Sequence, residues 1–156
     1  MRSSPIPPPV WMLLFGLAMW AANRFVPLLT LFPDPWRRLG VGLMLIAPIA
    51  PVTALIQFRR ARTTVNPIAI DTASALVTDG IYTWTRNPMY LGLALLLAGW
   101  AIHLASLSAA FGPPIFVVLI QQFQIRPEEQ ALRAKFGDEY DRYARRVGRW
   151  FGRGAA

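Results

Sequence analysis

Cysteine is absent from the 156-residue sequence, which excludes disulfide bonds, thiolate catalysis and metal sites that depend on cysteine. Acidic residues are also scarce, with eight Asp and Glu against 16 Lys and Arg and a formal net charge of +8. In a soluble protein such an excess would suggest nucleic-acid binding. Here the basic residues stand beside long apolar segments, so we expect them to face anionic lipid and expect no nucleic-acid partner.

Charged residues are missing altogether from two long stretches. The stretch from Leu39 to Phe58 has 20 residues, about the length with which a helix crosses a bilayer. The stretch from Asn87 to Ile125 has 39 residues, and as one helix it would be roughly twice as long as the ~30 Å hydrocarbon core is thick. It is therefore expected to fold back on itself, with a turn near Ser106 to Ala110.

A third apolar stretch, from Val10 to Phe32, is interrupted by Asn23, Arg24 and Pro27. Its front end could be a cleaved signal peptide. A further span explains it better, because the remaining chain is itself expected to be embedded in a membrane. The sequence thus predicts an all-α, polytopic transmembrane bundle with about four spans.

Basic residues fall between the second and third expected spans and again after Ile125, whereas the turn between the third and fourth spans has none. The positive-inside rule then predicts that the N- and C-termini are both cytoplasmic. We expect an integral protein of a bacterial inner membrane.

After Ile125 the apolar residues recur at helical spacing. They are Leu132, Phe136, Tyr140, Tyr143, Val147 and Trp150. The pattern predicts a basic amphipathic helix in the membrane interface. The expected organisation is one domain, 1–156, divided into two N-terminal spans (1–58), a cytoplasmic loop (59–87), a helical hairpin (88–125) and this helix (126–151).

Two short stretches carry residues suited to chemistry. Arg86-Asn87-Pro88 precedes the third span, and Glu128-Glu129 follows the fourth. Each could simply begin a helix, with proline in the first turn and carboxylates at the N-terminus. A hairpin would nevertheless bring both stretches to the same membrane face, where cationic, anionic and aromatic groups together suit a zwitterionic ligand.

The sequence around these two stretches is similar to that of a known enzyme family. TASALVTDGIYTWTRNPMYLG and RPEEQALRAKFGDEYDRYARRVGRW resemble the isoprenylcysteine carboxyl methyltransferase family and its phospholipid methyltransferase relatives. The resemblance implies methyl transfer from S-adenosyl-L-methionine, with S-adenosyl-L-homocysteine as product and no metal. The cofactor would enter from the cytosol, and a lipid-like or isoprenylcysteine-like acceptor would enter from the bilayer.

Matching positions imply roles for individual residues. Those expected to bind the cofactor are Leu76, Val77, Tyr82, Asn87, Pro88, Met89, Tyr90, Glu128 and Glu129. Arg86 and Arg126 are expected to position the acceptor. Many relatives have histidine where this chain has Asn87, and asparagine cannot act as a base. A carboxylate needs no base, so a carboxylate acceptor and O-methylation are favoured over an amine and N-methylation. Gln124 replaces an acceptor-orienting arginine of eukaryotic relatives, so the acceptor itself stays open.

Two other functions stay open beside this one. An NADPH-dependent membrane reductase of the sterol-reductase type shares the C-terminal pattern, although such enzymes are usually much longer. A non-enzymatic membrane scaffold could keep the same fold. His103, the only histidine, falls inside the third span and is expected to make an interhelical hydrogen bond. The oligomeric state is not predicted.

Overall fold

The computed structural model of the protein describes residues 6–31, 33–61, 75–152 and 154. Within these residues the regular elements are helices, which confirms the predicted all-α fold. The elements are α1 (Pro8–Phe25), α2 (Asp34–Ile46), α3 (Ile49–Arg60), the 3-10 turn η2 (Gly80–Thr83), α4 (Pro88–Leu104), α5 (Leu107–Ala110), α6 (Gly112–Ile120), the π-helical turn η3 (Gln121–Ile125), α7 (Arg126–Phe136) and α8 (Asp138–Arg146). Residues 62–74 of the predicted loop 59–87 lie outside the described part of the chain.

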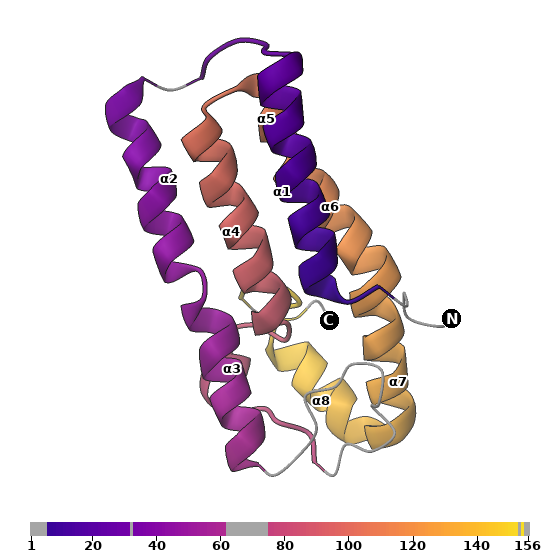
Figure 1. Ribbon diagram of the computed structural model, residues 1–156. Coiled ribbons are helices and arrows are strands. Elements are labelled where there is room, and N and C mark those ends of the chain that lie inside the picture. The colour runs from indigo at the N-terminus through magenta and orange to yellow at the C-terminus, as the bar shows by residue number, and fades with distance from the viewer. Residues whose placement is uncertain (1–5, 32, 62–74, 153, 155–156) are drawn as a thin grey trace.

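Four columns of helix form an elongated bundle (Figure 1). They are α1, the α2–α3 pair, α4, and the run from α5 through α7. The start of α1, the start of α4 and the whole of α8 lie toward one end of the bundle, which we call the lower end from its place in Figure 1. The loops before α2 and after α4 lie at the opposite, upper end.

Two continuous helical segments are long and apolar enough to cross a membrane. They are Asp34–Arg60, with 27 residues, and Leu107–Phe136, with 30 residues. Helix α4, Pro88–Leu104, is apolar but shorter. The expected fold-back of the 87–125 stretch occurs at Ala105 and Ser106, where Ala105 has a left-handed backbone with φ 56°.

Close backbone packing joins α2 to α4. A Cβ atom added to Gly40 would lie 2.6 Å from the main-chain nitrogen of His103, and one added to Gly99 would lie 2.7 Å from the main-chain oxygen of Gly40. Side chains larger than hydrogen do not fit such a contact. Glycine therefore lets the two helix backbones approach directly, as small residues do between membrane helices.

At the upper end two connecting segments pair through their main chains. The Leu31 N–H donates to the Ala105 carbonyl at 2.8 Å, and the Leu107 N–H donates to the Leu29 carbonyl at 2.9 Å. These bonds satisfy backbone groups that helix ends leave unpaired. They also fix the first two helical columns to the last two.

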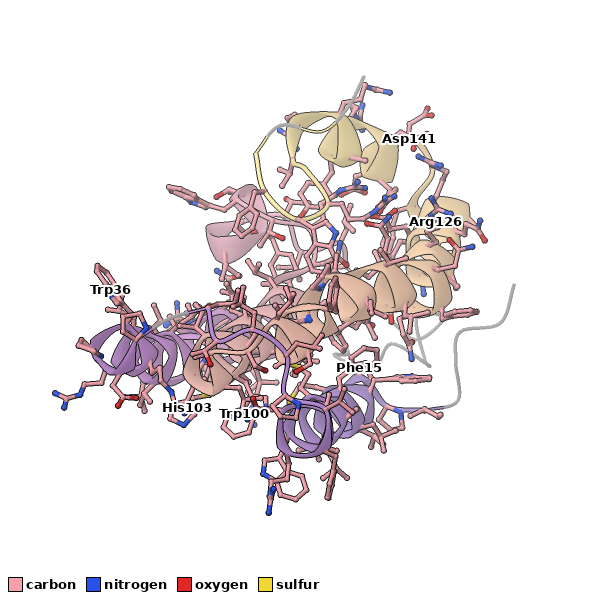
Figure 2. All side chains as sticks on the ribbon, turned by 90° about the horizontal axis from the view of Figure 1, so that it is seen from above. Phe15, Trp36, Trp100, His103, Arg126 and Asp141 are labelled. Carbon is pink, nitrogen blue, oxygen red and sulfur yellow. The ribbon has the colours of Figure 1, made fainter. Side chains whose placement is uncertain are left out.

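His103 lies on α4 away from α8, where Asp141 is labelled, and its ring stacks on Trp100 with 5.5 Å between ring centroids (Figure 2). The imidazole does not make the expected interhelical hydrogen bond, because its Nδ1 is buried without a partner among the described residues. The His103 carbonyl instead accepts from Arg37 Nε at 2.8 Å. The imidazole therefore contributes packing, and the hydrogen bond fixes the start of α2.

The single C-terminal helix expected over 126–151 is replaced by two helices. Gly137 has φ 51°, a backbone that favours glycine, and it separates α7 from α8. Helix α8 ends at Arg146, and Val147 is extended. The apolar face of α8 does not lie open to a membrane, because Tyr140 and Tyr143 are buried in a cluster with Ala54, Val77 and Tyr82.

We expect Gly40→Ala to destabilise the bundle by about 1–3 kcal/mol, because the added methyl must push α2 away from α4. Gly42→Ala is the matched control on the same helix, since a Cβ there meets no atom within 4 Å. That control should be neutral or slightly stabilising, as alanine favours helix. Unfolding in detergent, followed by circular dichroism, measures both. Equal stabilities of the two variants would contradict the close contact.

Candidate functional site

The turn before α4 is held by hydrogen bonds to the C-terminal segment. Thr85 Oγ1 accepts from the Asn87 N–H at 3.1 Å and donates to the Arg149 carbonyl at 3.2 Å. Asn87 Nδ2 donates to the same carbonyl at 3.1 Å. Asn87 occupies the N-cap position of α4, but its side chain does not cap the helix. Its amide instead fixes residues 85–87 against the end of the chain.

Tyr90 and Glu128 meet at the lower end of the bundle. Tyr90 stands on the first turn of α4 and Glu128 on the first turn of α7. The Tyr90 hydroxyl donates a short hydrogen bond to the Glu128 carboxylate, and the Tyr90 side chain is buried. The hairpin thus brings together an aromatic hydroxyl and a carboxylate from the two stretches that the sequence singled out.

Glu129 lies between two arginines. Its carboxylate accepts hydrogen bonds from Arg149 Nε and Nη2 at 2.6–3.1 Å, and it lies 3.3 Å from Arg86 Nη1. Arg86 Nη1 also donates to the Tyr140 hydroxyl at 3.0 Å. The side chains of Arg86, Glu129 and Arg149 are 12%, 14% and 30% exposed. Glu129 is thus occupied by arginine, although the sequence assigned it to the cofactor.

Val77 and Tyr82 lie in the buried cluster under α8, with Leu76 packed against it. The Tyr143 hydroxyl donates to the Tyr82 carbonyl at 2.8 Å. Burial raises the pKa of Tyr82 well above its usual range. Burial, together with the negative charge of Glu129, raises the pKa of Tyr140 to about 12. Both hydroxyls are therefore neutral at physiological pH.

Arg126 and Met89 do not join the network of side chains around Glu128 and Glu129. Arg126 is exposed on α7 and donates to Gln122 Oε1 at 2.5 Å (Figure 2). Met89 is 38% exposed, although Pro88 beside it is buried. Gln124 is buried, and its Nε2 donates to the Ile6 carbonyl at 2.8 Å. Of the two arginines expected to position the acceptor, Arg86 is therefore the one that joins the lower-end network, through Glu129.

Sequence reasoning missed Thr85, Tyr140 and Arg149 as parts of this network. Arg149 falls within the single helix expected over 126–151 and off its apolar face, where an arginine would be solvated. The chain actually leaves the helix at Val147, so Arg149 turns back toward α7. The signal that could have found it is the pair Gly148 and Gly152, which makes a continuous helix through Arg149 unfavourable.

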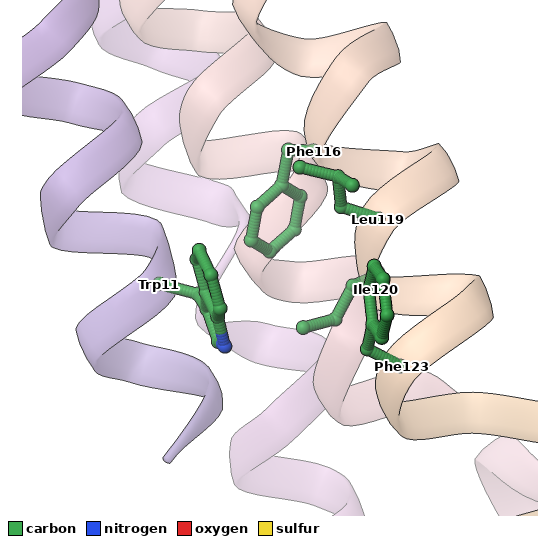
Figure 3. A pocket seen from close by; sticks show the side chains of 5 residues that line it. All are labelled: Trp11, Phe116, Leu119, Ile120 and Phe123. Carbon is green, nitrogen blue, oxygen red and sulfur yellow. The ribbon is translucent and has the colours of Figure 1, made fainter. Parts of the chain in front are cut away.

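A small apolar crevice, with about 10 Å³ of free space, lies between α1 and the α6–η3 segment (Figure 3). Its lining consists of Trp11, Phe116, Leu119, Ile120 and Phe123. Ile120 precedes Glu128 by eight residues on one continuous helical segment, a rise of roughly 12 Å. No lining residue is charged, so the crevice suits a hydrocarbon group. Among the described residues, no cluster of three or more His, Asp or Glu side chains could hold a metal ion.

Comparison with known families gives a match over most of the chain. The phospholipid methyltransferase family profile matches residues 36–139. The matched region contains α2 through the start of α8 and includes the Tyr90–Glu128 pair. The sequence-based resemblance to isoprenylcysteine carboxyl methyltransferases and phospholipid methyltransferases is confirmed.

Curated relatives agree with the family match. Protein-S-isoprenylcysteine O-methyltransferase B of Arabidopsis thaliana is 31% identical over 111 residues, which cover 69% of this chain and 55% of the plant protein. Protein-S-isoprenylcysteine O-methyltransferase of Schizosaccharomyces pombe is 33% identical over 75 residues, 46% of this chain and 30% of the yeast protein. The chain thus matches about half or less of each.

An uncharacterized protein of Haemophilus influenzae is 50% identical over 62 residues, which cover 40% of this chain and 98% of that protein. No solved structure matches the chain significantly.

We expect Glu129→Gln to destabilise the protein by about 2 kcal/mol. The substitution leaves Arg86 and Arg149 largely buried without a carboxylate, and an unpaired buried charge is costly even where partial exposure screens it. Glu139→Gln, on the exposed face of α8, is the control and should change stability by less than about 0.5 kcal/mol. Chemical unfolding in detergent measures the difference. Indistinguishable variants would contradict an energetically important cluster.

Proposed function

The chain belongs to the phospholipid methyltransferase family, and we propose that it transfers a methyl group from S-adenosyl-L-methionine to a lipophilic acceptor at the cytoplasmic membrane face. The observation that carries this proposal is the buried Tyr90–Glu128 pair at the lower end of the bundle. The pair stands beside the Arg86 cluster, which consists of Arg86, Glu129, Tyr140 and Arg149. Glu128 also lies on the same helical segment as four residues of the apolar crevice. A charged region and an apolar region along one helical segment suit an amphiphilic acceptor.

One carboxylate at the candidate site, that of Glu128, has the chemistry needed to hold the cofactor. Glu128 keeps its second carboxylate oxygen available beside the hydrogen bond from Tyr90, so it would hold hydroxyl or ammonium groups of S-adenosylmethionine by charge-assisted hydrogen bonds. The ring of Tyr90 would face the sulfonium, as aromatic rings bind other cations. When bound, the cofactor supplies an activated methyl group. The protein would contribute alignment of donor and acceptor.

The remaining cofactor assignments divide into direct and supporting ones. Leu76, Val77 and Tyr82 would shape the wall of the cofactor site, because they lie in or beside the buried cluster under α8. Pro88, buried at the start of α4, would contribute to the same wall. Asn87 would support the turn, since its amide N–H group is given to the Arg149 carbonyl. Met89 would contact the cofactor least, being partly exposed.

Arg86 would orient an anionic group of the acceptor. Its Nη1 serves Glu129 and Tyr140, whereas its Nε is buried and has no hydrogen-bond partner among the described residues. That free donor suits a carboxylate, which is nucleophilic without a base. The O-methyltransferase names of the plant and yeast relatives support the same choice. Arg126 is the weaker assignment, because it is exposed and paired with Gln122.

The crevice would mark where the hydrocarbon part of the acceptor, a lipid-like or isoprenylcysteine-like chain, enters. Helices α1 and α6 would have to separate there, because the present space of about 10 Å³ holds about one water molecule. The aromatic and branched lining of the crevice, with Phe123 half exposed at one side, favours an apolar chain entering from the bilayer. The four helical columns would be the four spans of an integral inner-membrane protein. Both termini and the Arg86 cluster would then be cytoplasmic, in agreement with the basic residues at the lower end.

Binding of S-adenosylhomocysteine tests the cofactor. We expect saturable calorimetric binding to the protein in lipid nanodiscs and a loss of affinity of at least about tenfold in Glu128→Ala, because a charge-assisted bond contributes roughly 1.5–3 kcal/mol. Glu139→Ala is the control and should bind normally. Absence of binding to folded wild type would overturn the methyltransferase proposal. Binding of NADPH instead would support a reductase, and no binding of either would support a scaffold.

Filling the crevice tests the acceptor site. Leu119→Trp should raise KM for a long-chain prenylcysteine acceptor by about tenfold or more, since the added ring occupies space that the chain would use. S-adenosylhomocysteine affinity should not change. Val118→Trp places the same ring on the neighbouring, exposed position and serves as the control. If both tryptophan variants kept the wild-type KM, the crevice would not be the chain-binding site.

A further inference from the structure

The segment that follows α8 lies across the two halves of the candidate site. Gly148 and Arg149 contact the turn before α4 through their main chains: the Arg86 N–H donates to the Gly148 carbonyl at 3.1 Å, and Thr85 and Asn87 both donate to the Arg149 carbonyl. The Arg149 side chain extends to Glu129 on α7. One residue thus touches both helix starts from which the site is built.

The arginine is anchored by two kinds of bond. Its main-chain oxygen accepts two side-chain hydrogen bonds, at 3.1 and 3.2 Å. Its guanidinium makes a forked contact with the Glu129 carboxylate, and hydrogen bonding to Glu129 raises the pKa of Arg149. A planar fork fixes orientation as well as distance, which lysine cannot do.

Neighbouring contacts hold the same segment in place. The Gly148 N–H donates to the Gly152 carbonyl at 2.6 Å, which closes a tight turn around Arg149. Trp150 Nε1 donates to Gln121 Oε1 at 3.0 Å, so the segment also reaches the π-helical turn η3. A Cβ atom added to Gly148 would be 3.0 Å from the Gly152 main-chain oxygen, so the turn needs glycine there.

We propose that Arg149 is a positioning residue of the site, which sets the distance between the Arg86–Asn87 turn and the first turn of α7. Glu129 acts as its partner in this role and contacts no ligand. Because Glu128 adjoins Glu129 and Tyr90 stands one turn after Arg86, loss of Arg149 would let the Tyr90 and Glu128 sides of the site separate. The identity of the ligand that the site binds rests on the proposed function above.

Hydrogen exchange tests the positioning without any ligand. In nanodiscs, Arg149→Ala should lower the exchange protection of the Arg86 amide by about tenfold, while α6 and the upper end keep their protection. Arg149→Lys, which keeps the charge without the fork, should fall between wild type and alanine. Arg145→Ala, exposed on α8, is the control. Unchanged protection in Arg149→Ala would overturn the proposal.

Calorimetry then separates positioning from general stability. The folded Arg149→Ala protein should bind S-adenosylhomocysteine up to ~100-fold more weakly, because small displacements of aligned groups have large effects. Arg149→Lys should restore part of this affinity. Glu129→Gln should weaken binding less in the Arg149→Ala background than in wild type, since the two residues share one contact while Glu129 also pairs with Arg86. Wild-type affinity in folded Arg149→Ala, or additive losses in the double variant, would overturn the proposal.

The two proposals fail in different ways. A folded wild type that binds no S-adenosylhomocysteine would overturn the proposed function, and the exchange of the Arg86 amide would still decide the role of Arg149. Global loss of protection in Arg149→Ala, with no intermediate behaviour in Arg149→Lys, would show a residue needed only for folding and would also overturn the positioning role.

Discussion

The fold-back at Ala105 and Ser106 determines where the candidate site of this molecule lies. An apolar stretch that is too long for one bilayer crossing must reverse, and the reversal returns the chain to the end from which α4 began. Tyr90 and Glu128, 38 positions apart, thereby become hydrogen-bond partners. The paired segments at the upper end hold this reversal in register, so the arrangement at the lower end depends on contacts far from it.

Polar groups at the lower end are arranged in two connected tiers. The Tyr90–Glu128 pair keeps acceptor capacity open, whereas Glu129 is saturated by two guanidinium groups. Buried charges are costly unless they are paired, and the second tier meets this requirement for both arginines with one carboxylate. Under the proposed function, the adjacent glutamates would have separate tasks: Glu128 would face the cofactor, and Glu129 would hold the two arginines behind it.

Much of this arrangement could be predicted from sequence, and the exceptions have physical reasons. Uncharged stretches predicted the helices and the reversal, since hydrophobic length is a strong local signal. The motifs predicted Tyr90, Arg86 and Glu128 as neighbours. Periodicity alone could not reveal the break at Gly137, because the apolar spacing continues across it. Nor could it reveal Arg149, whose partners lie 20, 62 and 64 positions away and depend on tertiary packing.

The π-helical turn η3 lets one continuous helix serve two environments. Each π turn holds one residue more than an α turn, so the side chains after Ile125 are rotated by about 100° relative to an uninterrupted helix. The α6 side can then keep its crevice-lining face toward α1 while the α7 side turns Glu128 and Glu129 toward α4. Relatives that differ by one residue in this turn would present a different pair of side chains to the site while keeping every motif intact. The length of residues 121–125 is therefore as much a part of the functional signature as the residues on either side.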